Sequence, residues 1–174
     1  PDGKELAFIE ERNRLMVINL DTKKVRQITD GSTWFSTDGN FDYQWSPDGK
    51  WFTLEFIGNR HDPYSDIGLV SAKGDSPITN LTNSGYMSGS PRWVLDGNAI
   101  LFTTERYGMR AHASWGSQND AMLVFLNQDA FDKFRLSKED YELQKELEKE
   151  QKNTTETKKN GKKKGDNKEK SEEK

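Results

Sequence analysis

The chain has 174 residues, with 26 Lys and Arg against 29 Asp and Glu and a formal net charge of −3. It contains no cysteine, which excludes disulfide bonds and cysteine-ligated metal sites. No stretch approaches the length of apolar sequence that a membrane-spanning helix needs, and no basic patch with interleaved aromatic residues appears. We therefore expect no membrane span and no nucleic-acid partner.

The composition divides the chain near residue 132. Residues 1–132 hold 12 basic and 18 acidic residues and all five tryptophans, so they can build an apolar core. The remaining residues hold 14 basic and 11 acidic ones and are mostly Lys, Glu, Asn and Thr, a composition that buries little apolar surface. We expect a β domain over residues 1–132, a short exposed helix over 133–152 and a disordered charged low-complexity segment over 153–174.

A turn motif occurs three times in the β domain. Pro1-Asp2-Gly3-Lys4 opens the chain, Trp45-Ser46-Pro47-Asp48-Gly49-Lys50 follows, and Trp93-Val94-Leu95-Asp96-Gly97-Asn98 comes third. The glycines of successive copies are 46 and 48 residues apart. Proline fixes φ ahead of the turn, aspartate bonds its own backbone, and glycine accepts the positive φ that closes the turn. A period of this size is typical of repeat architectures such as β-propellers.

An alternating apolar strand follows each turn. Its aligned apolar residues lie two positions apart and therefore share one face; they are Leu6 and Phe8, Phe52 and Leu54, and Ile100 and Phe102. We expect all six to be buried against a neighbouring sheet. The alternative, three unrelated hairpins, does not explain why turn, strand and spacing recur together.

The predicted strands number three, four and three in successive copies. They cover residues 5–10, 15–20 and 25–29, then 41–45, 50–57, 67–71 and 77–81, then 90–94, 99–104 and 121–126. The first copy lacks the strand that should precede its turn, so we expect the chain to begin within a repeat, and the third copy has no evident fourth strand. The sequence therefore predicts an all-β fold, a partial β-propeller of four-stranded antiparallel blades with about two and a half blades.

The helix predicted after the β domain begins near a capping box. Ser137-Lys138-Glu139-Asp140 has the residues of this motif, and good helix formers follow as far as Leu147. Its apolar stripe is thin, so we expect an exposed helix that frays by about Gln151.

The connection between the second and third strands of the blade lengthens along the chain. Measured from Gly3 to Arg14, from Gly49 to Asp66 and from Gly97 to Asp120, it grows by six residues at each step. In an up-and-down blade these connections lie opposite the Asp-Gly turns, and insertions gathered on one face of a repeat array are typical of its binding side. We predict a peptide-binding surface there, formed by Arg60, His61, Tyr64, Arg106, Tyr107, Arg110, His112 and Trp115.

In this prediction the arginines bond peptide carboxylates and the aromatic rings provide apolar platforms. In the alternative, which the sequence leaves open, the same loops pack on one another and close the mouth of the ring.

Patterns for metal binding and catalysis are weak in this chain. Two sets of metal ligands can be drawn in the loops, His61 with Asp62 and Asp66, and His112 with Asp120. With two histidines and no HExxH-type spacing, we predict neither a metal site nor a cofactor. Ser114 lies near His112 but lacks the G-x-S-x-G context of a nucleophile, so we predict no catalytic residue within the chain.

The repeat resembles that of a known family. Trp45-Ser46-Pro47-Asp48-Gly49-Lys50, Asp66-Ile67 and Leu81-Thr82 resemble the TolB-like β-propeller repeat found in TolB and in tricorn-type serine peptidases. Residues 58–141, with Arg60-His61-Asp62-Pro63-Tyr64-Ser65-Asp66 and Ser114-Trp115-Gly116-Ser117, are most similar to the large bacterial tricorn homologues. The resemblance covers roughly residues 1–150, and a Lys-rich insertion in the propeller fits the same group.

In those proteins an N-terminal propeller precedes a second propeller, a PDZ-like domain and a serine peptidase core. The resemblance implies that this chain is a non-catalytic propeller segment of a hydrolase, which admits or orients peptide substrates for proteolysis elsewhere. The family's catalytic serine belongs to the peptidase core, so no catalytic residue carries over to this sequence. The implied partners are a peptide or protein substrate, the remaining blades and the peptidase core.

The resemblance also implies a periplasmic or otherwise extracytoplasmic location, with the cytoplasm as the alternative. The alternative function is a TolB-like protein-interaction propeller with no attached enzyme.

Overall fold

The computed structural model describes residues 2–35, 39–58, 62–109, 118–147 and 149. The chain divides into two compact units, Pro1–Ala130 and Phe131–Lys174, and each is described by itself. None of the helices in the described ranges has the length and apolar character needed to cross a membrane.

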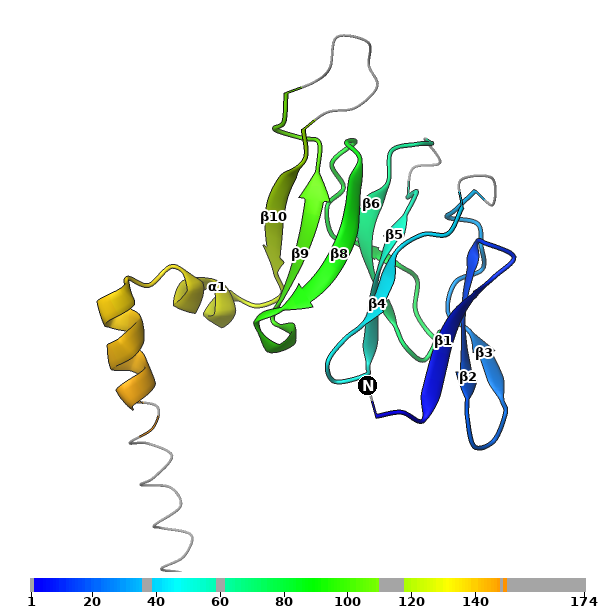
Figure 1. The fold of residues 1–174 in the computed structure, drawn as a ribbon, viewed down its shortest axis with the longest axis horizontal. Helices are drawn as coiled ribbons and strands as arrows, with labels where there is room; N and C mark the ends of the chain where they lie inside the picture. The colour runs from blue at the N-terminus through cyan, green and yellow to red at the C-terminus, as the bar shows by residue number, and fades with distance from the viewer. Residues whose placement is uncertain (1, 36–38, 59–61, 110–117, 148, 150–174) are drawn as a thin grey trace, which may run out of the picture. The chain divides into compact units, whose positions relative to one another are not determined.

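The first unit contains three antiparallel sheets (Figure 1). The first sheet consists of β1 (Glu5–Glu10), β2 (Arg14–Asn19) and β3 (Val25–Gln27). The second consists of β4 (Tyr43–Trp45), β5 (Trp51–Phe56), β6 (Asp66–Ser71) and β7 (Thr79–Asn80). The third consists of β8 (Ser88–Val94), β9 (Ala99–Thr104) and β10 (Asp120–Phe125). The three, four and three strands expected from the sequence are confirmed, and the described residues form no closed ring.

The pairing register is the same in the three sheets. The central pairs at matching positions are Ile9 with Leu15, Glu55 with Ile67, and Thr103 with Ala121. Because side chains alternate between the faces of a sheet, a shared register gives equivalent residues the same direction in each copy.

The sheets pack face against face. Phe52 and Leu54 of β5 join Leu15 of β2 in one buried cluster. Ile100 and Phe102 of β9 form a second buried cluster with side chains of β6. In both cases the apolar pair after the turn faces the preceding sheet, and the predicted burial of these four residues is confirmed.

The prediction that Leu6 and Phe8 are buried is wrong for Leu6, which is 55% exposed, while Phe8 is partly buried. In β1 it is Ala7 and Ile9 that pack against the cluster shared with the second sheet. Leu6 and Phe8 lie on the other face, toward the position of a preceding sheet, and none of the described residues covers that face as a sheet.

The turn between β4 and β5 shows why its motif recurs. The Ser46 Oγ accepts the N–H of Lys50 at 3.1 Å and that of Trp51 at 3.0 Å, while its hydroxyl donates to Asp48 at 2.6 Å. Gly49 has φ 70°, a backbone conformation that glycine adopts without a Cβ penalty. Asp48 also accepts the N–H of Lys50 at 3.1 Å, and in the first copy Asp2 likewise accepts the N–H of Lys4 at 3.1 Å.

The third copy of the turn has a different backbone. Leu95 and Asp96 have φ values of 52° and 55° and form the 3₁₀ helix η2 (Leu95–Gly97). Leu95 stands where the second copy has Pro47, whose ring would fix φ near −65°. The loss of proline therefore permits a turn that the second copy cannot adopt.

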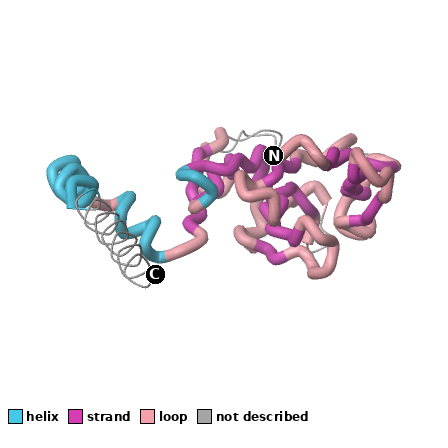
Figure 2. The backbone as a smooth tube through the Cα atoms, turned by 90° about the horizontal axis from the view of Figure 1, so that it is seen from below, coloured by secondary structure: helices cyan, strands magenta, loops and turns pink. Residues whose placement is uncertain are grey.

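Helices follow the last strand, as Figure 2 shows in cyan. The helix α1 (Gln128–Phe134) was not predicted, and the N–H of Ala130 near its start is accepted by the Asn127 side chain at 2.8 Å. Residues 138–147 are helical and lie within the predicted helix, and the Ser137 Oγ accepts the N–H of Asp140 at 3.2 Å, as a capping residue does. The charged segment predicted to be disordered, 153–174, lies outside the described residues.

Candidate functional site

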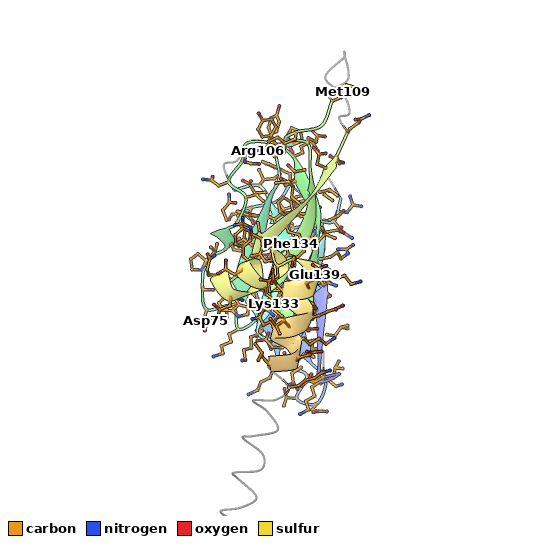
Figure 3. The ribbon with its side chains drawn as sticks, turned by 90° about the vertical axis from the view of Figure 1, so that its left-hand side faces the viewer. Asp75, Arg106, Met109, Lys133, Phe134 and Glu139 are labelled. Atoms are coloured by element: carbon orange, nitrogen blue, oxygen red, sulfur yellow. The ribbon has the colours of Figure 1, made fainter. Side chains whose placement is uncertain are left out.

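The loops that follow β5 and β9 lie at one end of the sheets, and the Asp-Gly turns lie at the other. A Cβ added to Gly97 would be 3.3 Å from the Pro47 ring, so two of the turns are neighbours. At the loop end, residues of the β3–β4, β5–β6 and β9–β10 connections line one cavity. Figure 3 labels Arg106 and Met109 toward the loop end and Asp75 toward the turn end. The two ends are arranged as the repeat predicts.

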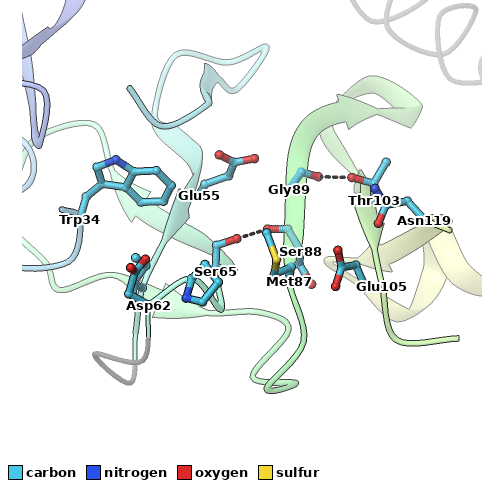
Figure 4. Close-up of a pocket in the computed structure, with 12 residues that line it drawn as sticks. Trp34, Glu55, Asp62, Ser65, Met87, Ser88, Gly89, Thr103, Glu105 and Asn119 are labelled. Carbon is cyan, nitrogen blue, oxygen red and sulfur yellow. Dashed lines mark hydrogen bonds between the residues drawn. The ribbon is translucent and has the colours of Figure 1, made fainter. Parts of the chain in front are cut away.

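The cavity has a volume of about 460 Å³ and lies between the second and third sheets (Figure 4). Its acidic side chains are Glu55, Asp62 and Glu105, which come from three different segments of the chain. Trp34 supplies an aromatic ring and Met87 a thioether. Among the described residues that line the cavity, none is Lys, Arg or His.

Hydrogen bonds join the two sheets beside the cavity. The Ser65 hydroxyl donates to the Ser88 carbonyl at 2.9 Å, and the Ser88 N–H donates to the Ser65 carbonyl at 2.9 Å. Within the third sheet, the Thr103 hydroxyl donates to the Gly89 carbonyl at 3.1 Å, as Figure 4 shows. The cavity walls are therefore fixed by the same contacts that hold the sheets together.

Glu55 is the acidic residue most tightly built into the site. One carboxylate oxygen accepts the N–H of Ser90 at 2.6 Å, and the other accepts that of Asp42 at 3.2 Å. A Cβ added to Gly89 would lie 2.6 Å from the Glu55 carboxylate, so glycine permits this close approach. Burial raises the pKa of Glu55 above its ordinary value of 4.5, and the two N–H donors oppose that rise. Glu55 thus links the second sheet to β8 and also lines the cavity.

The structure describes three of the eight residues predicted to bind peptide. Tyr64 and Tyr107 are 50% and 65% exposed, and the Arg106 guanidinium carbon lies 5.3 Å from the centre of the Tyr107 ring. All three belong to the predicted loops, but none of them lines the cavity. The other five lie outside the described residues; they are Arg60, His61, Arg110, His112 and Trp115.

Sequence reasoning missed the side chains that do line the cavity, above all Trp34, Glu55 and Glu105. One signal for Glu55 was present, because it is a charged residue between Leu54 and Phe56 in a strand that is otherwise apolar or neutral. A charge in such a strand indicates a hydrogen-bonded or functional group. The meeting of three separate connections at one cavity has no comparable signal in the sequence.

Asp66, considered as a metal ligand, has a structural role instead. It is 3% exposed and accepts hydrogen bonds from the Thr82 hydroxyl at 2.6 Å, the Asn80 amide at 2.8 Å and the Ser84 N–H at 3.2 Å. These three donors tie the start of β6 to the end of β7. Across the ranges that the structure describes, no three His, Cys, Asp or Glu side chains gather as a metal site would require.

The chain matches no known family model. Over 62 residues it is 37% identical to the uncharacterized peptidase YuxL of Bacillus subtilis (strain 168), a match that covers 36% of this chain and 9% of YuxL. Its structure is similar to that of the tricorn protease, with a TM-score of 0.53 and 16% identity over 72% of this chain and 13% of that chain. A TolB from Agrobacterium tumefaciens gives a TM-score of 0.47 and 18% identity over 72% of this chain and 47% of that one.

The likeness to the tricorn protease shows a propeller-type fold. The chain spans 9% and 13% of the two peptidases that it matches.

Proposed function

We propose that the three sheets are consecutive blades of a β-propeller within a larger serine-type peptidase, and that this non-catalytic segment admits or orients peptide substrates. The observation that carries the proposal is the cavity of about 460 Å³ between the second and third sheets, at the end where the loops lengthen. The sequence match to a peptidase and the propeller-type fold support it.

The outer face of the first sheet supports the continuation of the blade array. Leu6 and Val25 are 55% and 51% exposed on this face, and Phe8, Met16 and Ile18 beside them are partly buried. The equivalent faces of the second and third sheets are covered by the preceding sheet. An apolar sheet face of this kind is typical of a surface that a further blade buries.

The described lining of the cavity favours a positively charged group of the peptide. Carboxylates from three segments meet there, and charges interact more strongly in a partly buried site than in water. The indole ring of Trp34 adds an aromatic surface that attracts cations. A free amino terminus and the side chains of Lys and Arg carry the required charge. The expectation that Arg60, Arg106 and Arg110 receive peptide carboxylates stays a prediction.

Peptide cleavage by the complete protein tests the proposal. Replacing Glu105→Gln removes one cavity charge, and we expect KM for lysine-rich peptides to rise about fivefold with kcat unchanged, which corresponds to roughly 1 kcal/mol of binding. Peptides of the same length without basic groups should be cleaved as before. Asp75→Asn, an exposed position at the turn end, is the control and should change neither constant.

If the complete protein cleaves no peptide, the proposal that this chain is a segment of a peptidase is wrong. An unchanged KM for lysine-rich peptides in Glu105→Gln, with activity intact, would contradict the assignment of the cavity alone.

A further inference from the structure

The open edge of the third sheet holds a buried carboxylate oxygen that accepts no hydrogen bond from the described residues. Asp120 begins β10, and its Oδ2 is buried with no hydrogen-bond donor among the described residues. The strand order of this sheet is β10-β9-β8, so β10 is an edge strand. An unsatisfied buried acceptor is destabilising, so a neighbouring strand that supplied a donor here would stabilise the edge.

The second sheet shows what completes the same position. Asp66 begins β6 as Asp120 begins β10, and both lie one residue before the matched central pair of their sheets. The Asp66 carboxylate accepts from the Thr82 hydroxyl at 2.6 Å and from the Asn80 amide at 2.8 Å. Asn80 belongs to β7 and Thr82 lies two residues after it, and the third sheet has no described strand in that place.

The geometry of this last strand is the same in the first two sheets. In the first sheet, the Leu15 carbonyl accepts the N–H of Ile28 at 2.8 Å, and the Leu15 N–H donates to the Thr29 hydroxyl at 2.9 Å. In the second sheet, Ile67 makes both bonds with the Leu81-Thr82 pair, at 2.8 and 3.1 Å. Two sheets thus share one recognition pattern, an apolar residue followed by threonine. Ala121 is the equivalent of Leu15 and Ile67.

We propose that the edge of β10 binds a fourth antiparallel β-strand of this repeat type, which carries an apolar residue followed by threonine and comes from outside residues 1–174. In the shared register, the Ala121 carbonyl accepts the N–H of the apolar residue and the Ala121 N–H donates to the threonine Oγ1. The threonine hydroxyl then donates to Asp120. The residue two positions before the threonine lies opposite Met122, as Asn80 lies opposite Gly68 and Gln27 opposite Met16.

The chain itself offers no spare segment of this kind. Large apolar residues followed by threonine occur at Ile28-Thr29, Phe52-Thr53, Ile78-Thr79, Leu81-Thr82 and Phe102-Thr103, and all five belong to strands of the three sheets or flank them. No such pair occurs after Thr103. Addition of an extended segment to a sheet edge gains main-chain hydrogen bonds, and here the Asp120 carboxylate adds selectivity for a hydroxyl. This inference does not depend on the peptide-handling role of the cavity.

A peptide taken from the chain's own last strand is the probe. Residues 76–84 (Ser-Pro-Ile-Thr-Asn-Leu-Thr-Asn-Ser) contain the pattern, and we expect them to bind the 174-residue chain and slow amide exchange at Ala121 at least tenfold. The Thr82→Val peptide keeps the shape but lacks the hydroxyl, so it should bind about tenfold more weakly, a difference of about 1.4 kcal/mol. With Asp120→Ala in the protein, the difference between the two peptides should shrink, because only the Ala121 N–H then bonds the threonine hydroxyl. Equal binding of both peptides to the unaltered chain would overturn the proposal.

A cross-link tests the register independently of affinity. The chain has no cysteine, so Leu123→Cys provides a single thiol at the position equivalent to Leu69, which pairs with Thr79. A Thr79→Cys peptide should form the disulfide at least tenfold faster than an Asn80→Cys peptide, because opposed strand residues have the Cα separation that a disulfide needs. Equal rates would overturn the proposed register. Protection of β10 amides that appears without peptide and grows with protein concentration would overturn the proposed occupant in favour of a second copy of the chain.

Discussion

The second sheet is covered on both faces, whereas the first sheet is covered on one. Phe52 and Leu54 of the second sheet are packed against the first sheet, and Ile67 on its other face is packed against the third. Leu6, at the same repeat position as Phe52, is 55% exposed. Equivalent residues therefore point in the same direction in each copy, but a neighbouring sheet decides whether they are buried.

The largest expected effect is the difference in stability between a substitution in the second sheet and one in the first. Leu54→Ala should lower the free energy of unfolding of the 174-residue chain by about 2–5 kcal/mol, because it leaves a cavity in a fully buried cluster. Leu6→Ala should cost less than about 0.5 kcal/mol, since its side chain is already largely in water. Urea denaturation of both variants measures the difference.

The cost of Leu6→Ala should differ between this chain and a complete propeller. If a further blade covers the first sheet, Leu6→Ala should there cost about as much as Leu54→Ala, roughly 2–5 kcal/mol. A small cost of Leu6→Ala in the complete protein would contradict the continuation of the blade array beyond the first sheet.

The next effect compares the start of β6 with the start of β10. Asp66→Asn should cost about 2 kcal/mol, because the carboxylate accepts from three donors and an amide replaces one of its acceptor oxygens with a donor. Asp120→Asn should cost nothing or stabilise the chain slightly, since the Oδ2 of Asp120 accepts no hydrogen bond from any described residue. Thermal unfolding of the two variants gives the comparison, and similar losses at both positions would contradict the structural distinction between them.

The sequence predicted where the strands lie, but it did not predict which sheet faces a neighbouring sheet covers. Turn residues such as Gly49 act locally, and the alternation in Phe52-Thr53-Leu54 fixes which side chains share a face. These local rules predicted the number of strands in each sheet. They could not show that Leu6 is exposed, because its burial would require a preceding sheet, which the described residues do not form.

The side chains that line the candidate cavity were not predictable from the sequence. Loop lengthening predicted a binding surface at the end of the sheets where this cavity lies, but the acidic lining of the cavity depends on how distant segments meet. Trp34, Glu55 and Glu105 come from separate segments of the chain. The helix α1 was missed for a related reason, since its seven residues are too few to show a periodic apolar pattern.

A smaller effect concerns the contact between the first and second sheets. The Tyr43 hydroxyl donates to the Ala7 carbonyl at 3.1 Å, and Tyr43→Phe removes this bond while keeping the ring. We expect a loss of about 1 kcal/mol in the free energy of unfolding. Tyr64→Phe is the matched control because its side chain is half exposed in a loop, and it should have no measurable effect in the same denaturation experiment. Equal stability of the two variants would show that the hydroxyl contributes nothing to the contact.

The smallest effect is on how stability depends on pH. The contributions of Glu5 in the first sheet and Glu55 in the second should change with pH in opposite directions. Arg26 binds both carboxylate oxygens of Glu5, at 2.5 and 2.7 Å, and this hydrogen-bonded pair holds the pKa of Glu5 below its ordinary value of 4.5. The stabilisation is therefore fully present above pH 4.5 and is lost as the pH falls through the pKa of the folded state. Wild type should be more stable than Glu5→Gln by at most about 1 kcal/mol at neutral pH, because solvent screens this partly exposed ion pair, and by less in acid.

Glu55 should behave in the opposite way, because burial raises its pKa in the folded state. Its contribution is present below pH 4.5 and is lost as the pH rises through the pKa of the folded state. The stability of wild type relative to Glu55→Gln should therefore fall with increasing pH, while that relative to Glu5→Gln rises. Denaturation midpoints of the three proteins across the acidic range measure both slopes. Slopes of the same sign would mean that the two carboxylates do not occupy the different environments that the structure gives them.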